Sequence, residues 1–168
     1  VKVVATRHAL EFVTELSLRT LSQNKVYTDM FSVSGNVEVE HIALADWADL
    51  LVVAPATANI IGKYASGIAD DALSTLLLAC AKPVFLAPAM NSNMLHHPAT
   101  QANLQKLQGR GVQILGTGTG FLACGAAGDG RMLEPEQIFE SIKSHFVPKR
   151  ILSGKRALVT AGPTYEPI

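Results

Sequence analysis

The sequence has few cysteines, little aromatic content and no excess charge of either sign. Cys80 and Cys124 are too few for a disulfide scaffold and suit a reducing, cytoplasmic setting. Fourteen basic residues balance fourteen acidic ones, and neither sign forms a long run. The longest apolar stretches, residues 50–58 and 76–81, are shorter than the ~20 residues that span a bilayer. We therefore expect a cytoplasmic protein whose partner is neither a nucleic acid nor a membrane.

The remaining composition is typical of one globular domain. The chain has 168 residues, of which 48% are hydrophobic and 17% charged, enough for a full core. Residues 1–6 already have a strand pattern, and residues 154–168 have the pattern of a new strand and turn. We therefore expect the chain to be a fragment of a longer protein.

Four short segments are apolar on both sides of the strand pleat. They are VKVVAT (1–6), LLVVAPAT (50–57), PVFLAPAM (83–90) and GVQILGT (111–117). Continuous apolarity indicates burial on both faces, which parallel strands between helices require. The sequence therefore predicts a doubly wound, Rossmann-like α/β fold, in which ligands bind beyond the carboxyl ends of the strands.

Helical patterns separate these strands. Residues 60–81 predict a helix that breaks or closely approaches a neighbour at Gly62 or Gly67. Pro98 is suited to the first position of a further helix, which ends near residues 109–111. The segment 7–21 predicts a helix with the inner stripe Leu10, Phe12, Val13, Leu16 and Leu21.

The segment Ala87–Thr100, APAMNSNMLHHPAT, collects polar side chains directly after a predicted strand. His96 and His97 are sequence neighbours that point in different directions on a helix, without a nearby cysteine or acidic residue, so we expect solvated or capping histidines and no metal site. Asn91 has two interpretations. Its amide could bind a ligand carboxylate, or it could bond its own backbone in a turn. Met90 is by default an apolar filler.

Two other residues are candidates for proton chemistry. His41 could exchange protons near neutral pH, although a lone histidine is more often structural. Cys124 lies in a segment with six glycines between Gly116 and Gly130. We expect this segment to form neither helix nor strand and to behave as a mobile lid. Its glycines lack the Gly-Lys-Ser/Thr sequence of a phosphate-binding loop, which argues against a nucleotide site.

Three motifs together resemble the flavin-dependent cysteine decarboxylases, and most closely their phosphopantothenoylcysteine decarboxylase branch. They are HIALADWADLLVVAPATANIIGKYASGIADD (41–71), PAMNSNMLHHPAT (88–100) and ACGAAGDGRM (123–132). In addition, KRALVTAGPTYEPI (155–168) resembles the opening of a phosphopantothenate–cysteine ligase, which uses CTP and Mg²⁺. The resemblance implies an FMN-binding decarboxylase domain over residues 1–150, and a linker with the first strand of a ligase domain over residues 151–168. The resemblance also implies that the family's usual first strand and helix would precede Val1, so we expect this domain to be incomplete at its N-terminus.

The resemblance also implies roles for individual residues. Asn91 would bind the carboxylate of the substrate's cysteine moiety, His41 would be the active-site histidine, and Cys124 would be a proton donor. Thr6 would contact the FMN phosphate. The remaining FMN contacts would be Pro55, Thr57, Ala58, Asn59, Ala89 and Met90. Relatives form trimers with FMN between subunits, so we expect a homotrimer or a multiple of trimers.

The activity implied by the resemblance is FMN-dependent decarboxylation of 4'-phospho-N-pantothenoylcysteine to 4'-phosphopantetheine in coenzyme A biosynthesis. Oxidation of the cysteine moiety to a thioaldehyde would ease loss of the carboxylate, and reduction of the resulting enethiol would complete the reaction. Two alternatives remain, a peptidyl-cysteine decarboxylase and a catalytically silent FMN-binding regulatory subunit.

Overall fold

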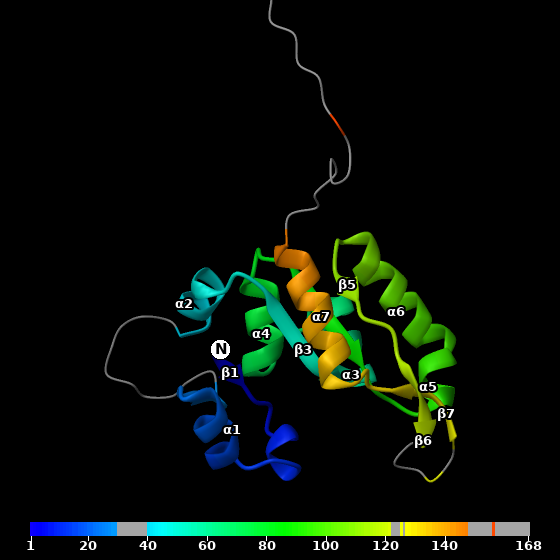
Figure 1. Ribbon diagram of the computed structural model, residues 1–168, viewed down its shortest axis with the longest axis horizontal. Coiled ribbons are helices and arrows are strands. Elements are labelled where there is room, and N and C mark those ends of the chain that lie inside the picture. Colours follow the sequence, from blue (N-terminus) through cyan, green and yellow to red (C-terminus); the bar gives the residue numbers. More distant parts are fainter. Residues whose placement is uncertain (30–39, 122–124, 126, 148–155, 157–168) are drawn as a thin grey trace, which may run out of the picture.

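The protein folds into parallel strands flanked by helices, as the computed structural model shows for residues 1–29, 40–121, 125, 127–147 and 156 (Figure 1). The central sheet has the order β3 (Leu51–Ala56), β4 (Val84–Pro88) and β5 (Gln113–Ile114), and both pairings are parallel. The parallel α/β class predicted from the sequence is confirmed.

A second, smaller sheet precedes the central one. It pairs β1 (Val3–Val4) with β2 (Val26–Tyr27) in parallel. Within the described ranges, no ladder of hydrogen bonds joins this pair to the central sheet. The connection is instead through apolar side chains, because Val4 and Tyr27 pack with Leu51 against the cluster around Leu44 and Leu76.

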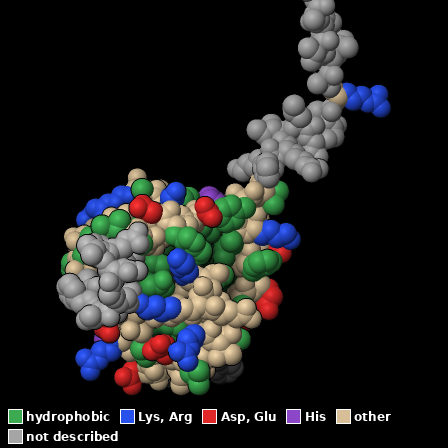
Figure 2. Space-filling model, turned by 90° about the vertical axis from the view of Figure 1, so that its left-hand side faces the viewer, with side chains coloured by type: hydrophobic (Ala, Val, Ile, Leu, Met, Phe, Trp, Pro, Cys, Tyr) green, Lys and Arg blue, Asp and Glu red, His purple; other side chains and the backbone are tan. Residues whose placement is uncertain are grey.

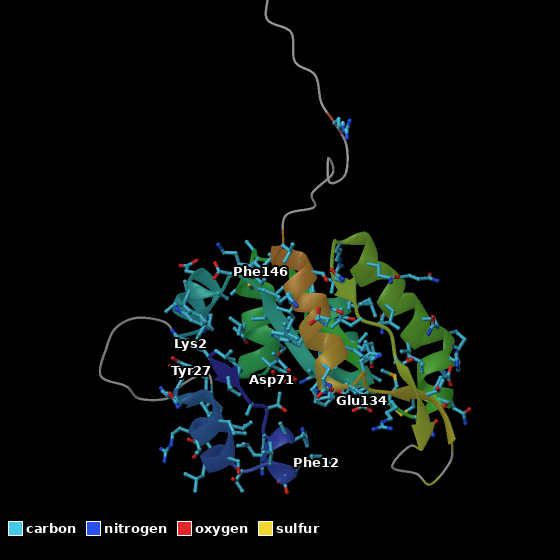
Figure 3. All side chains as sticks on the ribbon, in the orientation of Figure 1. Lys2, Phe12, Tyr27, Asp71, Glu134 and Phe146 are labelled. Carbon is cyan, nitrogen blue, oxygen red and sulfur yellow. The ribbon has the colours of Figure 1, made fainter. Side chains whose placement is uncertain are left out.

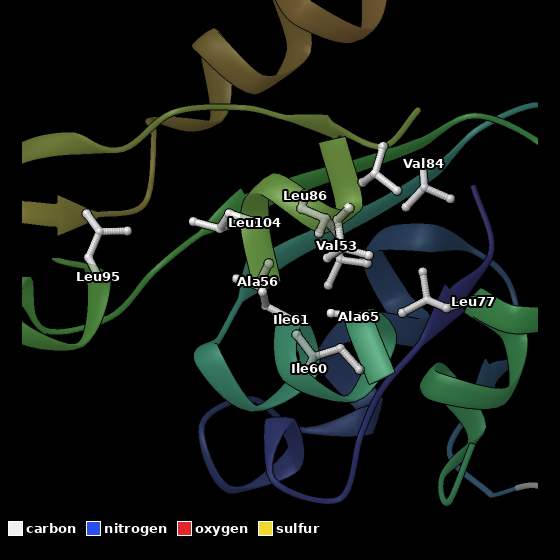
Figure 4. Packing of buried hydrophobic residues seen from close by; sticks show 12 residues of the cluster. Val53, Ala56, Ile60, Ile61, Ala65, Leu77, Val84, Leu86, Leu95 and Leu104 are labelled. Atoms are coloured by element: carbon white, nitrogen blue, oxygen red, sulfur yellow. The ribbon is translucent and has the colours of Figure 1, made fainter. Parts of the chain in front are cut away.

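The central sheet is covered on both faces, because successive side chains of a strand point to opposite sides. On one face, Val84 and Leu86 pack with residues of α3 (Ala58–Ser66), α4 (Ala72–Ala79) and α6 (Pro98–Gly109) (Figure 4). On the other face, Phe85 and Ala87 pack with Ile138 of α7 (Pro135–Phe146), the helix that crosses the front of Figure 1. All five residues of β4 are buried, which explains its uninterrupted apolar sequence.

Helices α3 and α4 are separated at Gly67, one of the two glycines at which the sequence predicted a break. Gly67 ends α3 with φ +73°, the left-handed region that favours glycine, whereas Gly62 lies within the helix. Helix α4 begins at the N-cap Asp71, whose side chain accepts a hydrogen bond from the Ser74 N–H at 2.8 Å. Helix α2 (Glu40–Trp47) packs on α4 through Leu44 and Ala45.

The inner stripe predicted for residues 7–21 is wrong. A short 3-10 turn, η1 (Ala9–Glu11), precedes α1 (Glu15–Ser22), and Thr14 caps α1 by accepting from the Ser17 N–H at 3.1 Å. Two helical segments with a cap between them cannot present one continuous stripe. Phe12 is 93% exposed and lies at the outer edge of this region (Figure 3). Leu16 and Leu21 are also exposed.

The glycine-rich segment forms strands, contrary to the prediction from its composition. Strands β6 (Gly118–Phe121) and β7 (Ala127–Arg131) pair in antiparallel orientation, with Thr119 opposite Asp129 and Gly120 opposite Gly128. Glycine lacks a side chain but keeps both backbone hydrogen-bonding groups, so it can occupy a hairpin ladder. Residues 122–124 and 126, which include Cys124, lie outside the described part of the chain.

Charges of both signs are mixed with apolar groups on the face shown in Figure 2. Within the described residues, no helix is long and apolar enough to cross a membrane.

Candidate functional site

The carboxyl ends of β3 and β4 lie side by side and bring two of the sequence motifs together. Ala56 is in register with Pro88, and the Ala89 N–H donates to the Ala56 carbonyl oxygen at 3.0 Å. The segments that follow, residues 57–59 and 89–91, therefore leave the sheet next to each other. This placement at the carboxyl edge matches the sequence prediction.

The residues after β3 combine small size with exposed polar groups. Ala54 and Pro55 are exposed although they belong to the strand, and Ala58 is half-buried. Thr57 is the N-cap of α3, because its Oγ1 accepts from the Ile60 N–H at 3.5 Å. A threonine hydroxyl that accepts one bond can still donate another, so the exposed Thr57 and Asn59 can both offer hydrogen bonds to a ligand.

Asn91 follows β4 and is the N-cap of the short helix α5 (Ser92–His96). Its side-chain oxygen accepts from the Asn93 N–H at 2.8 Å, so the turn interpretation of this residue is confirmed. That bond does not conflict with the carboxylate interpretation. It uses the amide oxygen as an acceptor, whereas a carboxylate would require the donors of the amide NH₂ group.

Strand β7 is attached to the segment around Asn91 by three hydrogen bonds. The Met90 N–H donates to the Gly130 carbonyl oxygen at 2.9 Å, and the Ser92 hydroxyl donates to the Asp129 carbonyl oxygen. The third links the His96 Nε2 and the Asp129 carboxylate, and it holds the pKa of Asp129 below its ordinary value of 3.8. The hairpin and the Asn91 segment thus form one structural unit.

The two adjacent histidines differ in what they contact. His97 accepts from the Ala99 N–H at 3.2 Å and so caps α6 next to Pro98, which confirms its predicted capping role. His96 is exposed, but it is neither only solvated nor a cap, because it pairs with Asp129, 33 residues further along the chain. Sequence spacing gave no signal for this contact, because it depends on the hairpin that the glycine content had argued against.

His41 lies apart from Asn91 within a single chain. It is at the beginning of α2, and Figure 1 shows α2 and α5 at opposite sides of the molecule. His41 is half-buried, and its buried Nδ1 has no hydrogen-bond partner among the described residues. A buried polar atom without a partner is unfavourable, so this imidazole suits a site that another group completes.

Thr6 lies in the segment that follows β1, where its Oγ1 accepts from the Ala9 N–H at 3.2 Å. The structure therefore gives it a local turn contact, and its predicted contact with a phosphate stays a prediction. Cys124 lies outside the described residues, as does the segment 151–168 apart from Arg156. In the described part of the chain, no three His, Cys, Asp or Glu side chains are grouped to hold a metal ion.

Comparisons with known proteins agree with this arrangement. Residues 1–147 match the family described as Flavoprotein. The coenzyme A biosynthesis bifunctional protein CoaBC of Bacillus subtilis is 48% identical over 170 residues, covering 100% of this chain and 42% of that protein. The chain therefore spans less than half the length of this relative.

Solved structures match over most of both chains. A PPC decarboxylase mutant complexed with pantothenoylaminoethenethiol has a TM-score of 0.79 and 36% identity, covering 86% of this chain and 82% of that one. The FMN binding protein AtHal3 has a TM-score of 0.74 and 36% identity, covering 86% and 80%. From the family match and these similarities, the chain belongs to the flavoprotein family.

Proposed function

We propose that the chain carries an FMN-dependent decarboxylase site that converts 4'-phospho-N-pantothenoylcysteine to 4'-phosphopantetheine. The observation that carries this proposal is the placement of residues 57–59 beside residues 89–91 at the edge of two adjacent parallel strands. One segment has the small and hydroxyl-bearing residues that a flat cofactor requires, and the other has the amide for a carboxylate. The similarity to a PPC decarboxylase, of which the chain covers 82%, supports the choice of substrate.

The residues at this edge fit FMN. Ala58 and Ala89 are small and half-buried, so a flat ring can approach the backbone closely beside Met90. Pro55, Thr57 and Asn59 are exposed at the same edge, and the last two offer polar contacts. We assign Thr6, in the segment after β1, to the phosphate. When bound, FMN supplies a reversible two-electron oxidation of the substrate's cysteine moiety, which makes loss of the carboxylate favourable.

Asn91 would hold the carboxylate that is lost. An amide donates hydrogen bonds without carrying a charge, so it can bind the anion and still release neutral carbon dioxide. The bond from the Asn93 N–H to the Asn91 oxygen sets the orientation of the amide, with the NH₂ group as its donor end. Asn91 would thus orient the substrate with its carboxylate toward the NH₂ group.

His41 would manage the proton of the substrate thiol, because histidine exchanges protons near neutral pH. Its distance from α5 within one chain, seen in Figure 1, supports a site shared between subunits, with His41 of one chain facing Asn91 of another. We therefore propose a homotrimer or a multiple of trimers, with FMN between subunits. Cys124 would deliver the proton that completes the product.

We also propose that this unit works within a bifunctional cytoplasmic protein. The relative from Bacillus subtilis is named as a bifunctional protein of coenzyme A biosynthesis, and residues 155–168 resemble a ligase opening. The second activity would be a phosphopantothenate–cysteine ligase that uses CTP and Mg²⁺.

The test is incubation of the purified full-length protein and FMN with 4'-phospho-N-pantothenoylcysteine, with measurement of carbon dioxide and of product mass. We expect equimolar carbon dioxide and 4'-phosphopantetheine. A yellow protein without turnover would contradict the proposal and favour a silent FMN-binding subunit. Turnover of a peptide with a C-terminal cysteine, but not of this substrate, would favour a peptidyl-cysteine decarboxylase.

A further inference from the structure

We propose that Ser92 and Asp129 are positioning residues, which hold the Asn91 amide in the orientation that binds the substrate carboxylate. This inference rests on the proposed function, because it concerns how Asn91 performs its role there. It adds two residues that do not themselves contact the carboxylate. Their effect is transmitted through the attachment of β7 to the Asn91 segment.

The hydrogen bonds to β7 bracket Asn91 on both sides. Directly before it, the Met90 N–H donates to the Gly130 carbonyl oxygen at 2.9 Å. Directly after it, the Ser92 hydroxyl donates to the Asp129 carbonyl oxygen. Four residues further on, His96 at the last position of α5 pairs with the Asp129 carboxylate. A shift of the Asn91 backbone away from β7 would therefore break at least one of these bonds.

Helix α5 needs this support because it is too short to be ordered by itself. It has five residues, whereas isolated helices below ~12 residues are marginal in water. Asn93 and Met94 are exposed, and Leu95 is the buried residue of α5. Contacts from outside the helix must therefore fix its first turn, and β7 supplies them close to Asn91.

The backbone of β7 at Gly130 lies unusually close to the backbone of Met90. Gly130 has φ +113°, and an added Cβ would lie under 3.0 Å from the Met90 carbonyl oxygen. Only glycine lets β7 come this near. This close approach keeps the Ser92 hydroxyl within reach of the Asp129 carbonyl oxygen, and the Asp129 carboxylate within reach of His96.

The His96–Asp129 pair is exposed, with side-chain accessibilities of 63% and 40%, so its contribution to global stability is small. Its removal should therefore leave the chain folded.

The experiment uses Ser92→Ala, Asp129→Ala and the double variant in the full-length protein loaded with FMN. The measured quantities are KM and kcat for 4'-phospho-N-pantothenoylcysteine, and the inhibition constant of 4'-phosphopantetheine, which lacks the carboxylate. We expect KM of the double variant to rise about tenfold, the scale of a lost hydrogen bond to a charged group, with kcat nearly unchanged. The inhibition constant of the product and the flavin absorbance should stay at wild-type values.

His97→Asn is the matched control. His97 neighbours His96 but caps α6 and has no bond to β7 among the described contacts, and asparagine is a good N-cap. This variant should keep the wild-type KM. If the double variant does not fold, His96→Asn replaces it in the test, because this variant removes only the exposed contact with Asp129. It should raise KM in the same direction.

Two results would overturn the inference. One is a wild-type KM in the double variant, or in His96→Asn if the double variant does not fold. The other is an equal weakening of substrate and product, which would indicate a general disturbance instead of a lost carboxylate contact. Absence of turnover in the wild-type protein is a different result, which would reject the proposed function itself.

Discussion

Replacement of Gly130 by alanine should detach β7 from the segment that carries Asn91. Gly130 has φ +113°, a conformation that side-chain-bearing residues rarely adopt, and its added Cβ would approach the Met90 carbonyl oxygen to under 3.0 Å. The obstacle is a main-chain atom, so it cannot move aside as a flexible side chain would. One of the two backbones must shift, and the bond from the Met90 N–H to the Gly130 oxygen is lost.

The expected loss of stability follows from these two effects. Backbone strain at such a position costs about 1–3 kcal/mol. A lost hydrogen bond adds about 1 kcal/mol. Together they give about 2–4 kcal/mol, which corresponds to a fall in the melting temperature of roughly 4–16 °C for a domain of this size.

The assay is thermal unfolding of the purified protein, with two glycine controls. Gly67→Ala has φ +73° but meets nothing within 4 Å, so it should show backbone strain alone, about 1–2 kcal/mol. Gly109→Ala has neither constraint, lies in α6 and should be neutral or slightly stabilising. An equal effect of Gly130→Ala and Gly67→Ala would refute the reasoning, because the close approach would then contribute nothing.

Three further predictions concern the site and its support. Asn91→Asp should abolish turnover, because a carboxylate would repel the substrate carboxylate, while flavin absorbance stays normal; measurable activity would remove the assigned role. Cys124→Ser should accumulate an oxidised, decarboxylated product, detectable by mass spectrometry, whereas ordinary product would contradict its role as proton donor. Asp71→Ala should destabilise the protein by about 1–2 kcal/mol at pH 7, because α4 loses its N-cap. Burial favours the neutral carboxyl, but bonds from Lys63 and Ser74 outweigh it and lower the pKa of Asp71 below 3.8. The Asp71 contribution should therefore be present above pH 3.8 and disappear as the pH falls through the lower folded value, which denaturant titrations at several pH values can check.

The sequence was sufficient to predict the strands of the sheet and the edge where the motifs meet. Continuous apolarity in residues 83–90 correctly indicated burial on both faces, Pro98 correctly marked the start of α6, and Gly67 correctly marked the end of α3. These signals are local, because they depend on backbone geometry and burial within one segment. The pairing of the segments after β3 and β4 followed from them.

Contacts between distant segments were the part that could not be predicted. The hairpin of β6 and β7 depends on backbone pairing, which the glycine content conceals. The contact between His96 and Asp129 depends in turn on that hairpin. Likewise, the capping by Thr14 outweighed the apolar spacing of residues 10–21, because a local hydrogen bond restarts the helix in a new phase.

The most direct test of the central claim uses 4'-phospho-N-pantothenoylcysteine labelled with carbon-14 in the carboxyl group of its cysteine moiety. The full-length protein with FMN should release one labelled carbon dioxide per molecule of 4'-phosphopantetheine formed, and Asn91→Asp should release none. Retention of the label by a folded, flavin-loaded wild-type protein would contradict the account.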